Sequence, residues 1–191
     1  ALPVAGLMHT HAHNRRITDS AASGTAMATG HKARAGAVSV DPVTGEPLKS
    51  LGEIAKERGM KVGLLSTSPI DDATPAVFYG HSPTRGARYE LALQLARAGL
   101  DFVGGGGASG GKARYCDGKT SPFDVARKEG YKLVQGRTAL LKLKPGDGRI
   151  WFASSVDSPA AGMAFEVDRQ DVRDQPSLAE LTGKAIEMLD G

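Results

Sequence analysis

A serine and an aspartate open a run of small residues near the start of the chain. Residues 18–26 have the sequence Thr-Asp-Ser-Ala-Ala-Ser-Gly-Thr-Ala, and helix-compatible residues continue as far as Gly30. The hydroxyl of Ser20 is therefore expected at a helix N-terminus, where free N–H groups and the helix dipole favour an anion such as phosphate. A serine oxygen becomes an effective nucleophile when a base or a metal lowers its pKa. Local sequence allows both a helix N-cap and a nucleophile at Ser20, and it favours the N-cap because caps are far commoner.

A glycine cluster is the second feature that could do chemistry. The segment Gly104–Gly110 contains the GxGxxG spacing, and Gly106–Lys112 resembles a phosphate-binding P-loop. The next residue is Ala113, so the Ser or Thr that a P-loop needs for Mg²⁺ is missing. We therefore expect a flexible glycine loop and keep a non-catalytic phosphate- or nucleotide-binding module at this loop as an alternative.

The composition limits the class of protein. A chain of 191 residues with 40% hydrophobic and 24% charged residues is typical of a soluble globular domain with its own core. The net charge is only +3, and no dense Lys/Arg stripe with interleaved aromatic residues is present, which argues against a nucleic-acid partner. No apolar run is long enough to span a bilayer. The first eight residues lack the features of a signal peptide.

Helical and strand-like stretches alternate along most of the chain. Ser50 is expected to cap a helix with Glu53 as its capping-box partner, and Ser177 with Glu180 repeats that pattern near the end. Further helices are predicted at residues 91–98 and 123–129, and strands at 2–9, 61–65, 101–103 and 131–134. Helices that alternate with short apolar strands favour an α/β fold with a mostly parallel sheet.

Two segments and one arginine resemble those of a known enzyme family. The sequence of Thr18–Gly30, TDSAASGTAMATG, is similar to the nucleophile segment of alkaline phosphatases of the bacterial type. Asp71–Ala76 resembles that family's DATPA or HATPA motif, and Arg85 follows the motif's threonine at the spacing of the family's phosphate-binding arginine. Weaker similarity continues in order along nearly the whole chain. The resemblance implies a three-layer α/β/α sandwich, here a single partial domain over residues 1–191, and it makes Ser20 a nucleophile.

The resemblance implies a role for each matching residue. Ser20 attacks phosphorus and becomes a phosphoserine, Arg85 binds two phosphate oxygens, and Asp19 helps to hold the arginine. Thr74 is implied as a Mg²⁺ ligand, Asp72 as a support of that magnesium site, and Ser20 as a residue activated by zinc. Two Zn²⁺ ions and one Mg²⁺ are the implied cofactors. Phosphate monoesters are the implied substrates, because a bidentate arginine suits a terminal phosphate.

Part of the family's metal-binding set has no counterpart in this sequence. Nothing before Ser20 matches the upstream Asp-Gly-Met segment, and the family's remaining zinc ligands and its magnesium glutamate belong to a C-terminal half that would follow Gly191. The last helix would feed a further strand in an α/β protein. We therefore expect a central fragment of the family's chain. We also predict that the isolated chain cannot bind both zinc ions and has no efficient phosphatase activity.

Several alternatives stay open beside this hypothesis. They are a phosphodiesterase of the same superfamily, the binding module at Gly104–Gly110, and a natural short pseudoenzyme. The resemblance also implies export to the periplasm or cell surface and allows for a homodimer. His81 lies where the family often has a histidine, and we expect it to support the structure rather than catalysis.

Overall fold

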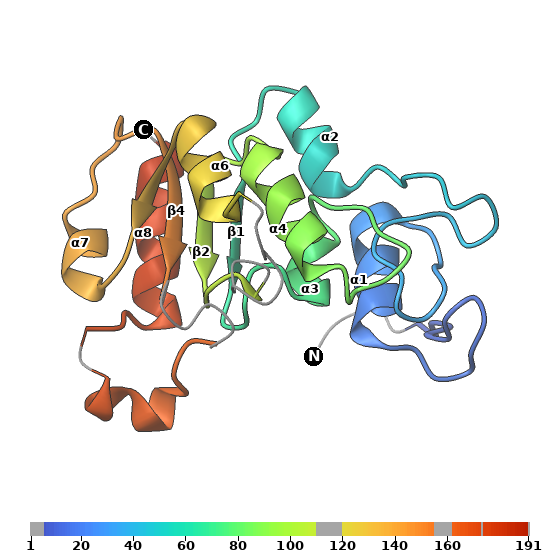
Figure 1. Ribbon diagram of the computed structural model, residues 1–191. Helices are drawn as coiled ribbons and strands as arrows, with labels where there is room; N and C mark the ends of the chain where they lie inside the picture. The colour runs from blue at the N-terminus through green and yellow to red at the C-terminus, as the bar shows by residue number, and fades with distance from the viewer. Residues whose placement is uncertain (1–5, 110–119, 155–161, 173, 191) are drawn as a thin grey trace.

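The computed structural model describes residues 6–109, 120–154, 162–172 and 174–190, and helices and strands alternate along them (Figure 1). The helices that precede the second strand lie on one side of the molecule, with α1 farthest from the sheet. In chain order the elements are α1 (Ser20–Thr29), α2 (Leu51–Glu57), β1 (Gly63–Ser66), α3 (Ala73–Ala76), α4 (Arg88–Arg97), β2 (Phe102–Gly105), α6 (Pro122–Lys128), β3 (Tyr131–Val134), α7 (Arg137–Leu141), β4 (Arg149–Ala153), the 3₁₀ helix η2 (Glu166–Asp171) and α8 (Leu178–Asp190).

The four strands form one sheet in the order β1-β2-β4-β3. All three neighbouring pairs are parallel, which confirms the predicted parallel sheet. β3 matches its predicted residues, whereas β1 and β2 begin and end slightly later in the chain than predicted. β4 has no counterpart among the predicted strands, although it lies at the centre of the sheet. The strand expected at residues 2–9 is wrong for residues 6–9, which form no strand, and residues 1–5 lie outside the described part.

The side chains of the central strands alternate between two cores. Phe102, Ile150 and Phe152 belong to the core that also contains side chains of α8. Val103 and Trp151 belong to the opposite core, with side chains of α4 and α6. All five side chains are fully buried. Because successive strand residues point to opposite faces, helices cover both sides of the sheet and produce the three layers seen in Figure 1.

Helix α1 packs on α3, which follows β1 in the chain. The contact is close at Gly24, where an added Cβ would lie 3.2 Å from a methyl group of Val77. The buried Thr25 side chain ties α1 to the next segment, because its hydroxyl donates to the Ala37 carbonyl and accepts from the Ser39 N–H at 2.9 Å. This packing fixes the start of α1 relative to the start of α3, the two places that carry the predicted site residues.

The two predicted capping boxes are present. The Ser50 hydroxyl accepts from the Glu53 N–H at 3.2 Å, and the Glu53 carboxylate accepts from the Ser50 N–H at 2.8 Å. Ser177 and Glu180 make the same reciprocal pair at the start of α8. Such pairs join residues only three positions apart, so local sequence is enough to predict them.

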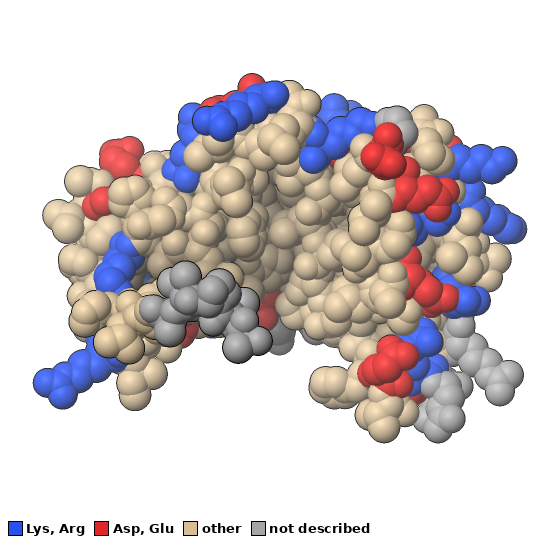
Figure 2. Space-filling model, turned by 180° about the vertical axis from the view of Figure 1, so that it is seen from behind, with Lys and Arg blue, Asp and Glu red and all other residues tan. Residues whose placement is uncertain are grey.

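The surface seen from behind has most of its charged side chains along its margins (Figure 2). Basic and acidic side chains are mixed there, and the middle of this face consists of uncharged residues around a hollow. Among the described residues, no helix is both long enough and apolar enough to cross a membrane.

His81 forms a half-buried pair with Glu53 beneath α2. Its Nε2 lies 2.9 Å from Glu53 Oε1, and its Nδ1 lies 2.8 Å from the Ser39 carbonyl oxygen. The hydrogen bond that His81 donates to Glu53 raises the pKa of His81 despite burial. Burial opposes ionisation of Glu53, but His81 and Ser50 outweigh it and lower the pKa of that carboxyl to about 2. These contacts support the expectation that His81 has a structural role.

The shifted pKa values predict how stability depends on pH. The raised pKa of His81 contributes stability that is complete below its ordinary value of 6.5 and is lost as pH rises through the folded-state value. The lowered pKa of Glu53 contributes stability that is complete above 4.5 and is lost as pH falls towards about 2. In urea unfolding, His81→Asn should cost on the order of 1 kcal/mol more at about pH 6 than at about pH 9. His31→Asn, at an exposed histidine, is the control, and an equal cost at both pH values would contradict the prediction.

Candidate active site

Asp19 caps helix α1, and Ser20 is the first residue of the helix. Asp19 Oδ1 accepts hydrogen bonds from the N–H groups of Ala22 and Gly36, each at 3.1 Å. Ser20 is exposed and follows the cap, so its hydroxyl is not needed to satisfy the helix end. The N-cap interpretation of Ser20 is therefore wrong, because the preceding carboxylate takes that position.

The guanidinium of Arg85 reaches Ser20 from a segment 65 residues further along the chain. Its Nη1 donates to Ser20 Oγ at 2.6 Å and lies 3.5 Å from Asp19 Oδ2. Its Nη2 donates to Asp72 Oδ1 at 2.9 Å. The Arg85 backbone N–H also donates to the Gly36 carbonyl, which fixes this segment beside the loop that follows α1. Asp19, Ser20, Asp72 and Arg85 thus form one cluster, the serine–arginine site.

Asp72 enters this site as the N-cap of α3. Its Oδ1 accepts from the Ala73 N–H at 2.8 Å and from Arg88 Nη2 at 2.7 Å, in addition to Arg85. Thr74 is exposed on the first turn of α3, near the capping carboxylate in sequence. The structure thus brings Asp19, Ser20 and Asp72 into contact with Arg85. The resemblance implies the Asp19–Arg85 contact, but it places Asp72 at the magnesium site and does not imply its contact with Arg85. Thr74 remains exposed.

Both carboxylates of the serine–arginine site are held ionised. Burial opposes ionisation of Asp19, but the N–H groups of Ala22 and Gly36 outweigh it, and with Arg85 they lower the pKa of that carboxyl. Burial also opposes ionisation of Asp72, but the Ala73 N–H, Arg88 and Arg85 lower its pKa. Arg85 therefore lies between two negative groups that orient its planar fork, while its Nη1 stays directed at the serine oxygen.

Arg88 is a member of this network that sequence reasoning did not select. It is the first residue of α4, and it binds Asp72 and the backbone carbonyl of Asp71. The available signal was its position three residues after Arg85. That signal is weak, because the spacing does not say what the side chain contacts, and only the tertiary structure shows its partners.

The predicted metal ligands form at most a partial set. Asp72, Thr74 and Ser20 supply oxygen atoms at the starts of two helices, but Asp72 Oδ1 already accepts from three N–H donors. Mg²⁺ requires roughly six oxygen ligands, and structural or catalytic Zn²⁺ about three or four protein ligands. The described ranges hold no group of three or more His, Cys, Asp or Glu side chains that could bind a metal. These residues on their own do not fit a complete zinc or magnesium site.

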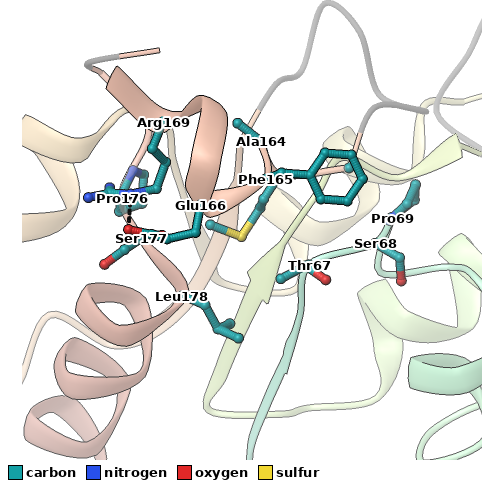
Figure 3. A pocket seen from close by; sticks show the side chains of 12 residues that line it. Thr67, Ser68, Pro69, Ala164, Phe165, Glu166, Arg169, Pro176, Ser177 and Leu178 are labelled. Carbon is teal, nitrogen blue, oxygen red and sulfur yellow. Dashed lines mark hydrogen bonds and ion pairs between the residues drawn. The ribbon is translucent and has the colours of Figure 1, made fainter. Parts of the chain in front are cut away.

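A cavity of about 460 Å³ lies between the end of β1, the 3₁₀ helix η2 and the start of α8 (Figure 3). Its lining is mainly apolar and includes the exposed side chains of Phe165 and Leu178. Its arginine, Arg169, is paired with Glu166 at 2.8 Å. No residue of the serine–arginine site lines this cavity, and its one lining arginine already has an acidic partner. It is therefore a poor site for a phosphate group.

The described part of the glycine cluster is buried rather than flexible. Residues 104–109 are all buried, and an added Cβ on Gly105 would lie 2.2 Å from the Ser66 carbonyl oxygen. The Ser109 N–H is already used, because it donates to the buried Asp71 carboxylate at 2.8 Å. The expected flexible loop is thus wrong for these residues, where glycine permits close packing. The rest of the P-loop-like segment lies outside the described residues.

Fold and site together define a class of protein. It is an α/β protein with a parallel sheet, in which an exposed serine at a helix N-terminus faces an arginine held by two carboxylates. A helix N-terminus and a guanidinium are both favourable for a phosphate group. Comparison with protein families agrees, because the model of the family described as alkaline phosphatase matches residues 1–104. The chain belongs to the alkaline phosphatase family.

Individual relatives match over most of this chain but over only part of their own length. Alkaline phosphatase 4 of Bacillus subtilis is 35% identical, and the match covers 96% of this chain and 39% of that protein. The alkaline phosphatase of Escherichia coli is 31% identical over 99% of this chain and 50% of its own. The solved alkaline phosphatase of the Antarctic bacterium TAB5 superposes with a TM-score of 0.82 at 27% identity, covering 97% of this chain and 51% of that one. A variant of the TAB5 enzyme has magnesium bound in the site called M3. The chain thus spans about half or less of the relatives it matches.

Proposed function

We propose that this chain supplies the nucleophile and the phosphate-binding arginine of a phosphomonoester hydrolase that works through a phosphoserine. The observation that carries the proposal is the 2.6 Å contact between Arg85 Nη1 and Ser20 Oγ at the start of α1. It puts a nucleophilic oxygen, a fixed positive charge and a helix N-terminus at one point. Membership of the alkaline phosphatase family supports it.

In the proposed reaction Ser20 Oγ attacks the phosphorus of a phosphate monoester. The new Oγ–P bond forms as the bond from phosphorus to the ester oxygen breaks. Ser20 loses its hydroxyl proton to solvent, and the departing ester oxygen takes up a proton from solvent and leaves as the alcohol. Water then cleaves the phosphoserine to give inorganic phosphate and to restore the hydroxyl of Ser20. Arg85 holds the other phosphate oxygens throughout. The dipole of α1 favours their negative charge at the start of the helix. Bound zinc would lower the pKa of the serine and stabilise the departing oxygen.

Metal binding in this proposal involves more than these 191 residues. Asp72 and Thr74 would contribute oxygen ligands to a magnesium site and Ser20 would contact zinc, while the other ligands would come from the segments that the relatives have in addition. Export to the periplasm or cell surface and assembly into a homodimer are further parts of the proposal, and they rest on the family alone.

Hydrolysis of p-nitrophenyl phosphate and of bis-p-nitrophenyl phosphate tests this function. The protein to use is the whole enzyme, that is, a chain that adds the relatives' further segments to these residues. We expect the monoester to be hydrolysed much faster than the diester, because Arg85 presents a fork to a terminal phosphate with several free oxygens. Faster diester hydrolysis would favour a phosphodiesterase, and absence of both activities would overturn the proposal.

The isolated 191-residue chain is expected to lack efficient turnover. Its serine–arginine site is formed, but a serine hydroxyl without its activating metals stays largely protonated at neutral pH. The measurement is p-nitrophenyl phosphate hydrolysis with and without added Zn²⁺ and Mg²⁺, beside the whole enzyme. Turnover by the short chain at the rate of the whole enzyme, lost on Ser20→Ala, would show that the prediction is wrong.

A further inference from the structure

Arg88 joins the serine–arginine site to the interior of the protein. Its side chain is 21% exposed, and its Nη2 donates to Asp72 Oδ1 at 2.7 Å. Its Nη1 donates to the backbone carbonyl of Asp71 at 2.9 Å and lies 3.9 Å from Asp71 Oδ1. The guanidinium thus bridges two consecutive acidic residues just before α3.

The anchor of Arg88 is itself firmly held. The Asp71 side chain is completely buried, and its Oδ1 accepts from the Ser109 N–H at 2.8 Å, at the end of the glycine segment that follows β2. A buried carboxylate is stable only when it is paired and hydrogen-bonded. Arg88 is therefore fixed by contacts that do not involve the serine or a phosphate.

Arg88 and Arg85 share a single oxygen of Asp72. Arg85 Nη2 donates to Oδ1 at 2.9 Å and Arg88 Nη2 to the same atom at 2.7 Å. One carboxylate can balance about one positive charge, so the closer partner, Arg88, takes up part of the charge that would otherwise neutralise Arg85. Arg85 keeps its orientation from Asp72 and retains positive charge for an anion at Ser20.

We infer that Arg88 is a positioning residue, which balances the charge of Asp72 and so leaves Arg85 available to bind the phosphate of the substrate. This inference rests on the proposed phosphomonoesterase function. Arg88 acts through Asp72 rather than on Ser20, because its guanidinium binds the Asp71 carbonyl and the Asp72 carboxylate. Without Arg88, Asp72 would pair with Arg85 alone and draw that guanidinium away from the phosphate.

Steady-state kinetics of the whole enzyme test this role with Arg88→Met and Arg88→Lys. For Arg88→Met we expect the KM for p-nitrophenyl phosphate and the inhibition constant for inorganic phosphate both to rise about tenfold, the scale of one charge-assisted hydrogen bond. Arg88→Lys retains the positive charge, so both constants should return to within about threefold of wild type. Arg97→Met, which removes an exposed arginine at the other end of α4, should leave both constants unchanged.

These constants separate positioning from a purely structural role. A structural role would lower the folded, active fraction and hence the apparent kcat, whereas KM and the inhibition constant do not depend on how much enzyme is folded. An Arg88→Met variant with wild-type constants would overturn the inference, and so would equal impairment of Arg88→Met and Arg88→Lys. A wild-type enzyme without activity would instead reject the proposed function. In that case the affinity for inorganic phosphate, measured by calorimetry for wild type, Arg88→Met and Arg88→Lys, still decides the role of Arg88.

Discussion

Replacing Ser20 with alanine is expected to abolish phosphomonoester hydrolysis by the whole enzyme. The substitution removes the oxygen that Arg85 Nη1 contacts at 2.6 Å and that would carry the phosphoryl group. Loss of a nucleophile that acts as one unit with its neighbours lowers kcat by about 10⁴-fold or more. Stability should change little, because Ser20 is exposed and Asp19 rather than Ser20 caps the helix.

The matched control for this substitution is Ser23→Ala, one turn further along α1. The Ser23 hydroxyl donates to the backbone carbonyl oxygen of Asp19 at 2.8 Å and lies 3.5 Å from that of Ser20. Both contacts are to the backbone and leave the side chains of the serine–arginine site unchanged. Its removal should leave most of the activity. Mass spectrometry after acid quenching should find a phosphorylated peptide that contains Ser20 in wild type and in Ser23→Ala only. A phosphorylated form of the corresponding peptide in Ser20→Ala, or retained turnover by that variant, would refute the assignment of the nucleophile.

Replacing Arg85 with alanine is expected to lower kcat/KM by about 10²- to 10³-fold, the usual effect of removing a donor that stabilises transition-state charge. The same change removes the only cation that lies between Asp19 and Asp72 within hydrogen-bonding reach of the serine oxygen in the described structure. Without this positive charge, Asp19 and Asp72 would repel a phosphate more strongly, so inhibition by inorganic phosphate should also weaken.

Two further variants show whether the fork of Arg85 or only its charge is needed. Arg85→Lys should recover little of the lost activity, because an ammonium group cannot bind two phosphate oxygens and a carboxylate in one plane. Arg127→Ala removes a surface arginine paired with Asp124 on α6 and should have no effect on kcat/KM. Full activity of Arg85→Lys would mean that charge alone is sufficient, and full activity of Arg85→Ala would remove Arg85 from the site.

Much of the site was predictable from the sequence because its members belong to short segments. Asp19 and Ser20 are adjacent, and Asp72 lies in a motif of six residues, so the family resemblance could assign them without knowledge of the fold. Capping boxes were predictable for the same reason, since Ser50 and Glu53 interact over three residues. The identity of the cap on α1 was not, because Asp19 and Ser20 are both good caps and one of the two N–H groups that Asp19 accepts from belongs to Gly36, in a later loop.

The sequence by itself therefore determined the family, the segment proposed to carry the nucleophile, and the alternation of helices with parallel strands. Only the tertiary structure decided that Arg85 meets Ser20 and that Arg88 shares Asp72 with it. It also decided that the glycine segment is packed and that β4 lies in the centre of the sheet. The physical reason is the separation in sequence between the residues that interact. Caps and periodic apolar faces depend on neighbours within a turn or two, whereas guanidinium–carboxylate contacts and strand order depend on the packing of segments that are distant in sequence.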